Sequence, residues 1–137
     1  MSSWTIYAGG KAKPPFDTLC KRYLQKLESL KVTMREIEGK QWQNIIKHKS
    51  QRWIMWDEVG VQYSSPEFWK KLDSFSSHAL CFFIGEASGI PQKIFNQADE
   101  VWSLGPMTWP HLWARTMVLE QLYRKVLANK GHPYSFV

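Results

Sequence analysis

The stretch that decides the fold is VWSLGPMTWPHLWARTMVLEQLY, residues 101–123. Its first four residues have the apolar character of a short strand, and Gly105-Pro106 must interrupt regular structure. Pro110 suits the first turn of a helix, because no intrahelical amide partner is lost there. The pattern predicts a long amphipathic helix over residues 110–129, whose apolar face recurs at spacings of three or four residues: Leu112, Thr116, Leu119, Tyr123 and Val126.

Working back from this stretch, apolar segments alternate with helical patterns. The run ALCFFI, residues 79–84, is continuously apolar, as in a parallel strand that is buried on both faces. We therefore expect an α/β fold with a mostly parallel sheet flanked by helices, in one domain spanning residues 1–137. The expected strands are 4–8, 31–38, 53–56, 79–84 and 101–104, and the expected helices are 15–29, 65–75, 91–97 and 110–129. Residues 57–60 read as a polar exit from the third strand, and 39–50 fit either a short helix or a loop.

Composition narrows the function. A net charge of +6 suits a polyanionic partner such as RNA, although a basic protein with a solvated surface has the same charge. Cys20 and Cys81 form no CxxC pair and no Cys/His cluster, so we expect no metal, no disulfide and buried thiols in a cytoplasmic protein. The longest apolar run is far shorter than the roughly 20 residues that span a bilayer, and the first residues lack a signal-peptide pattern, so we expect no membrane contact.

Ligands of open parallel sheets bind outside the carboxyl ends of the strands. Three loops qualify here: Asp57 onward, 85–89 and 105–109. The glycines of the loop GEASG, residues 85–89, allow a close approach of a ligand, but the loop lacks both the Walker and the GxGxxG spacing, so a plain turn is an equal interpretation. Free amides where the last helix begins offer donors to a ligand.

His111 and Arg115 lie one helical turn apart on the same side of the last helix. As a pair they would hold an RNA phosphate or orient a base. The alternatives are a surface or capping role for His111 and a structural ion pair for Arg115. No nucleophile–base pattern supports hydrolysis. A reaction in which the protein only aligns a co-substrate that is already activated needs no such pattern.

Three blocks of the sequence resemble, in order and spacing, the ribosomal RNA large-subunit methyltransferase H family. The first is the strand and Gly-x-x-x-Gly loop at 83–89. The second is the stretch from Trp102 through Arg124, with Thr108, Pro110-His111 and Arg115. The third is the tail His132-Pro133-Tyr134, and weaker matches occur at 4–11 and at Trp56-Asp57. The resemblance covers nearly the whole chain, and the C-terminal third is its specific part.

This resemblance implies a SPOUT-type α/β knot, in which the C-terminal part forms a trefoil knot, and an obligate homodimer. It also implies that S-adenosyl-L-methionine is the donor in the methylation of N3 of a pseudouridine in 23S rRNA of the assembled ribosome.

Carried over by position, the resemblance assigns residues to donor, substrate and catalysis. Donor contacts are expected from Trp56, Gly85, Glu86, Leu104, Gly105, Pro106, Met107, Thr108 and Trp109. His111 and Arg115 are expected to bind the substrate. The expected catalytic residues are Arg115, His132 and Tyr134, with Arg115 and Tyr134 positioning the RNA. A tail group or a water molecule would assist the loss of the N3 proton.

The sequence departs from the family pattern at three places. Glu86 occupies a position where the family usually has glycine, so its carboxylate either crowds the donor or faces away. The family tail usually continues Tyr-His-basic, whereas here Tyr134 is followed by Ser135-Phe136-Val137, and the region 39–50 is shorter than the family pattern. Glu86 and the altered tail support an alternative function, a SPOUT-like dimer that binds RNA without catalysis. A third interpretation, a doubly wound domain for another nucleotide, lacks the phosphate-loop glycines and lysine.

Overall fold

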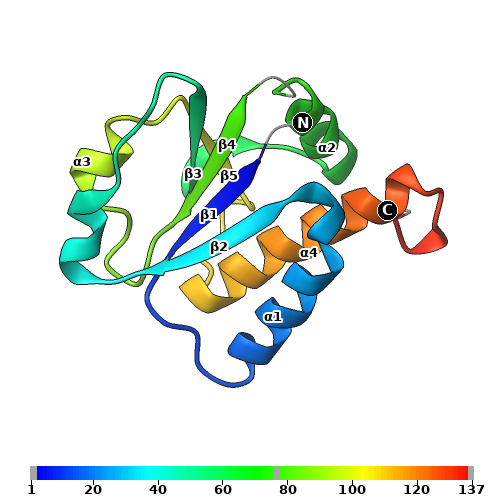
Figure 1. Ribbon diagram of the computed structural model, residues 1–137, viewed down its shortest axis with the longest axis horizontal. Helices are drawn as coiled ribbons and strands as arrows, with labels where there is room; N and C mark the ends of the chain where they lie inside the picture. The colour runs from blue at the N-terminus through cyan, green and yellow to red at the C-terminus, as the bar shows by residue number, and fades with distance from the viewer. Residues whose placement is uncertain (1–2, 76–77, 136–137) are drawn as a thin grey trace.

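The computed structural model describes residues 3–75 and 78–135, and its five strands form one parallel sheet with the order β2-β1-β4-β3-β5 (Figure 1). The predicted α/β fold, a parallel sheet flanked by helices, is confirmed. The strands are β1 Trp4–Gly9, β2 Val32–Ile37, β3 Gln51–Gln62, β4 Ala79–Ile84 and β5 Glu100–Ser103. The helices are α1 Phe16–Lys26, α2 Ser65–Asp73, α3 Gln92–Phe95 and α4 His111–Asn129, with short 3-10 helices at Glu28–Leu30, Gly39–Asn44 and Pro133–Ser135.

Strand β4 lies at the centre of the sheet, between β1 and β3, and both of its faces are covered. Leu80 and Phe82 pack into a cluster with side chains of α1, α2 and α4. Cys81 and Phe83 point the other way and pack with Ile94 of α3 and with the 39–44 segment. Side chains alternate between the faces of a strand, so burial on both faces accounts for the unbroken apolar run predicted for this strand.

The third strand is longer than the sequence predicts, and the reading of residues 57–60 as its exit is wrong. Trp56 and Val61 both lie opposite Trp102 of β5, so the four residues between them leave the ladder and then return to the same partner strand. Gly60 makes the return possible, because a Cβ at this position would lie 2.6 Å from backbone atoms of β5. The excursion carries polar residues over the carboxyl end of the sheet.

Helix α4 confirms the predicted terminal helix, with Pro110 as its N-cap residue. Its buried surface is wider than the predicted stripe, because the helix packs against the sheet and also against α1 and α2 (Figure 1). Of the predicted face, Leu112 and Tyr123 are only half-buried. The buried residues of the helix are Arg115, Thr116, Val118, Leu119, Leu122, Lys125 and Val126. Two of these, Arg115 and Lys125, are charged. The ammonium group of Lys125 pairs with Asp73 of α2 at 2.8 Å.

For residues 39–50 the sequence allowed either a short helix or a loop, and the structure contains both. Gly39–Asn44 forms a 3-10 helix, which Glu38 and Gln41 close with a capping box, and Trp42 is buried against the sheet. The chain then runs without regular structure to β3. Among the described residues, no helix combines the length and the apolar character that a membrane crossing requires.

The segment before β5 is tied to the start of β3 through Asp99. Its amide donates to the carbonyl of Trp53 at 2.8 Å, and its carboxylate accepts from the Trp53 amide at 2.8 Å. Lys47 lies 2.9 Å from the same carboxylate. Burial by itself would raise the pKa of Asp99, but the Trp53 amide and Lys47 together hold this pKa below its ordinary value.

Candidate active site at the carboxyl edge of the sheet

A cavity of about 590 Å³ lies at the carboxyl ends of β3, β4 and β5, where α4 begins. Its wall includes residues from all three loops that the sequence predicts as ligand-binding, as expected for an open parallel sheet. His111 lines it as well. The structure brings together every predicted donor-binding residue except Pro106: Trp56, Gly85, Glu86, Leu104, Gly105, Met107, Thr108 and Trp109.

The loop after β4 is a tight turn. A Cβ at Gly85 would lie 2.6 Å from the carbonyl carbon of Gly89 and 2.7 Å from the amide nitrogen of Ile90. The missing side chain of Gly85 therefore lets the turn close on itself, and the Gly89 amide donates to the carbonyl of Glu86 at 2.7 Å. This turn holds the side chain of Glu86, which is half-buried, in the cavity wall.

The loop after β5 is shaped by Ser103, a buried residue to which the sequence analysis gave no role. Its hydroxyl donates to the carbonyl of Gly105 at 2.7 Å and accepts from the Gly105 amide at 2.9 Å. Gly105 has a φ of +122°, which favours glycine. Further along, the hydroxyl of Thr108 donates to the carboxylate of Glu58 at 2.6 Å. This bond joins the β5 loop to the 57–60 excursion across the cavity.

Two acidic residues of the 57–60 excursion, Asp57 and Glu58, line the cavity; they belong to the first of the predicted ligand-binding loops, but neither was assigned a contact with the donor. Their position depends on the return of β3 to β5, which no local pattern in the sequence indicates. With Glu86, they make an acidic lining that contains neither lysine nor arginine among the described residues. Among all described residues of the chain, no group of three or more His, Cys, Asp or Glu side chains is arranged to hold a metal ion.

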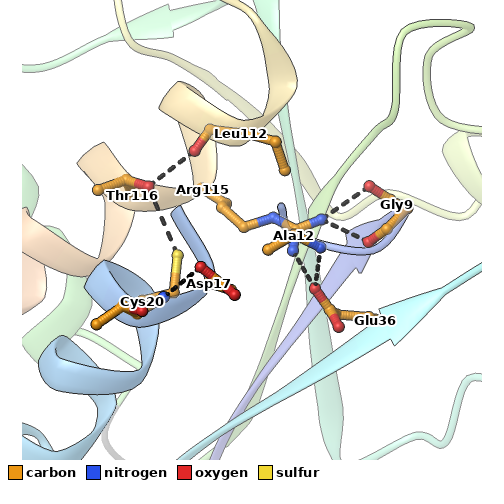
Figure 2. A network of polar contacts seen from close by, with 10 residues as sticks. Gly9, Ala12, Asp17, Cys20, Glu36, Leu112, Arg115 and Thr116 are labelled. Carbon is orange, nitrogen blue, oxygen red and sulfur yellow. Dashed lines mark hydrogen bonds and ion pairs between the residues drawn. The ribbon is translucent and has the colours of Figure 1, made fainter. Parts of the chain in front are cut away.

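Arg115, predicted to contact the substrate, is 1% exposed and does not line the cavity. Its guanidinium donates to the carbonyls of Gly9 and Gly10, each at 2.8 Å, and pairs with Glu36 at 2.6 Å (Figure 2). The same carboxylate oxygen of Glu36 accepts from the Ala12 amide at 2.6 Å. The structural ion pair that the sequence analysis considered as an alternative for Arg115 is therefore present. The ion pair joins α4 to β2, and the hydrogen bonds to Gly9 and Gly10 join α4 to the end of β1.

The tail residue Tyr134 lies at a second cavity of about 630 Å³, beside α2, α4 and the end of β5, which shares Trp56, Leu104 and Gly105 with the first cavity. Tyr134 lines it and donates from its hydroxyl to Glu120 at 2.8 Å, and the Tyr134 amide donates to Nδ1 of His132 at 3.1 Å. The bond to Glu120 raises the pKa of Tyr134, so its hydroxyl is protonated at neutral pH. Neither tail side chain lines the first cavity, and the tail residues Phe136 and Val137 lie outside the described residues.

Both cysteines are buried and free. The thiol of Cys20 lies 3.5 Å from the hydroxyl of Thr116 (Figure 2), and burial raises its pKa. Burial also raises the pKa of Cys81, to about 11. Both thiols are therefore protonated at neutral pH, in agreement with the sequence-based view that neither is an activated nucleophile.

Two solved structures with a similar fold are described as a methyltransferase and as a probable methylase family protein. The chain matches the SpoU methyltransferase AviRb from Streptomyces viridochromogenes, solved in complex with the cofactor AdoMet, with a TM-score of 0.55 and 11% identity over 93% of this chain and 58% of that one. It matches a probable methylase family protein from Haemophilus influenzae Rd KW20 with a TM-score of 0.61 and 9% identity, over 95% of this chain and 67% of that one. At these identities the two structures show a shared α/β fold.

The chain belongs to the family described as predicted SPOUT methyltransferases, whose model matches residues 1–135. Proteins named ribosomal RNA large subunit methyltransferase H are similar to it: 41% identical over 80 residues in Gluconacetobacter diazotrophicus (57% of this chain, 53% of that protein) and 37% over 87 residues in Gloeobacter violaceus (64% and 58%). The chain thus spans about half the length of the curated relatives it matches. The family recognised from the sequence blocks is confirmed, and the trefoil knot stays a prediction.

Proposed function

We propose that the protein is an S-adenosyl-L-methionine-dependent methyltransferase that acts on N3 of a pseudouridine in 23S rRNA of the assembled ribosome, in the cytoplasm. The observation that carries this proposal is the cavity in which three strand-end loops of a SPOUT family member meet. The names of its relatives and the AdoMet complex of AviRb support the choice of donor and of rRNA as substrate.

The residues of the cavity suit this donor. Its volume of about 590 Å³ falls within the usual range for small-molecule sites, roughly 300–1,000 Å³. Trp56, Ile84 and Leu104 supply apolar walls for an adenine ring, and the backbone of the 104–109 loop supplies polar groups. Glu86 supplies negative charge for a cationic ligand. When bound, the donor supplies an electrophilic methyl group, so the protein needs only to bind and orient the reactants.

The chain's own residues would then hold the target base. His111 lines the cavity at the start of α4, where no side chain caps the helix amides, so an imidazole and backbone donors face an incoming base. Arg115 acts as a positioning residue, because its bonds to Gly9 and Gly10 fix the strand end next to Glu86. In the described conformation the hydroxyl of Tyr134 donates a hydrogen bond to Glu120. A water molecule or another tail group would therefore accept the N3 proton.

The proposal includes a homodimer. Large apolar side chains are exposed around the start of α4 and on α1: Leu19, Met107, Trp109 and Trp113. Phe16 of α1 contacts Trp113 edge to face, with ring centroids 4.9 Å apart, so the two helices share this surface. Aromatic residues and methionine are enriched at protein interfaces. Neither His132 nor Tyr134 lines the first cavity of its own chain, so the tail of a second copy would supply their predicted roles in a homodimer.

Calorimetric titration of the purified protein tests the donor assignment, with S-adenosyl-L-methionine as ligand and ATP as control. Saturable binding of the donor, without binding of ATP, is the expected result. The second candidate function is an RNA-binding dimer without catalysis, which is favoured by one observation, the carboxylate of Glu86 inside the donor cavity. This second function would be supported if the protein binds ribosomes but does not bind the donor, either alone or with ribosomes present.

A further inference from the structure

Glu86 is held rigidly at the wall of the cavity. Its carbonyl accepts from the Gly89 amide at 2.7 Å, and the two residues form an isolated β-bridge. Its amide lies against β1, because a Cβ at Gly9 would be only 2.6 Å from it. The carboxylate oxygen Oε2 and the imidazole Nε2 of His111 approach the same point, 3.8 Å and 3.6 Å from where a Cβ of Gly10 would lie. The carboxylate therefore stands beside the predicted substrate side of the cavity.

Among the described residues, no side chain forms an ion pair with Glu86. Of the three carboxylates that line the cavity, that of Asp57 accepts from the Val59 amide at 3.0 Å and that of Glu58 accepts from Thr108 at 2.6 Å. The carboxylate of Glu86 makes no hydrogen bond or ion pair within the described part of the chain, and the described lining holds no lysine or arginine. Its carboxylate thus acts on whatever occupies the cavity, where a half-buried charge is screened less than one in bulk water.

We infer that Glu86 makes the cavity select the cationic donor over its neutral product; the inference rests on the proposed function. S-adenosyl-L-methionine carries a sulfonium, an ammonium and a carboxylate, for a net charge of +1. Transfer of the methyl group leaves S-adenosyl-L-homocysteine, whose sulfur is a neutral thioether, so its net charge is zero. The carboxylate attracts the donor and loses this attraction when the product forms, which favours release of the product and rebinding of donor.

Calorimetric titration of the full chain tests this inference with both ligands, for the wild type and for Glu86→Gln. The variant removes the charge and keeps the size of the side chain. We expect the ratio of donor to product affinity to fall about fivefold in Glu86→Gln, as one screened charge pair gives, with product affinity unchanged. Sinefungin, which has an amine cation in place of the sulfonium, should behave as the donor does. Glu28→Gln, at an exposed residue after α1, is the control for the change in net charge and should leave the ratio unchanged.

An unchanged ratio in Glu86→Gln overturns the inference while leaving the proposed function intact. A gain in donor affinity in this variant also overturns it, because that result means that the carboxylate crowds the donor. If the folded wild type, checked by circular dichroism, binds neither ligand even with ribosomes present, the proposed function fails, and the inference fails with it.

Discussion

Replacement of Arg115 by methionine should destabilise the protein strongly, because the guanidinium is 1% exposed and joins three chain segments. Arg115→Met keeps most of the side-chain length but leaves the carbonyls of Gly9 and Gly10 without their charged donor. Hydrogen bonds to charged groups contribute about 1.5–3 kcal/mol each. The pair with Glu36 adds little, because that carboxylate is 37% exposed. We therefore expect a loss of about 3–5 kcal/mol in the free energy of unfolding.

Urea unfolding followed by circular dichroism measures this loss. Arg22→Met, at an exposed residue of α1, is the matched control and should change the free energy of unfolding by less than about 0.5 kcal/mol. The double variant Arg115→Met/Glu36→Gln, compared with the single variants, isolates the ion pair, whose coupling energy should be below about 1 kcal/mol. If Arg115→Met lies within about 1 kcal/mol of the wild type, the view of Arg115 as the link between α4 and the β1 and β2 ends is refuted.

Three further predictions concern single side chains. The pKa of Asp99 is lower in the folded protein than its ordinary value of 3.8, so the stabilising contribution of this carboxylate is present above pH 3.8 and is lost as the pH falls through the folded-state pKa. The difference in the free energy of unfolding between the wild type and Asp99→Asn, measured in urea, should therefore be larger at pH 6 than at pH 2.5. A difference that does not change with pH would contradict this. Gly60→Ala should lower the melting temperature more than Gly39→Ala. A Cβ at Gly60 meets backbone 2.6 Å away, whereas at Gly39 nothing lies within 4 Å and the cost is only that of a left-handed φ of +50°; equal shifts would contradict the close crossing. The buried thiol of Cys81, with a pKa of about 11, should react with Ellman's reagent at pH 8 only after unfolding in urea, and rapid reaction of the native protein would contradict its burial.

Much of the fold could be predicted from periodicity. The apolar run of β4 indicates a strand that is covered on both faces, and the spacing in residues 110–129 gives the last helix to within one residue. The rule that ligands bind at the carboxyl ends of parallel strands then places the cavity, because it depends on topology alone. In contrast, the donor, the rRNA substrate and the dimer came only from the resemblance to a family.

Two features of the site could not be predicted, because they depend on contacts between distant segments. The 57–60 excursion has the composition of a loop, and its return to β5 is visible only once Gly60 is seen against that strand. Arg115 is a charged residue on a helix, and its burial depends on carbonyls more than a hundred residues earlier in the chain. A pattern of neighbours three or four residues apart carries no information about such partners.

The most direct test of the central claim is methyl transfer to ribosomes. Ribosomes from a strain without this modification would be incubated with the protein and S-adenosyl-L-methionine labelled in its methyl group, and the label in 23S rRNA would be mapped by nuclease digestion and mass spectrometry. We expect the label on N3 of one pseudouridine, and none on free 23S rRNA or without the protein. If the protein binds both the donor and the ribosome but transfers no label, it is an RNA-binding member of the family, and the proposed enzymatic function is contradicted.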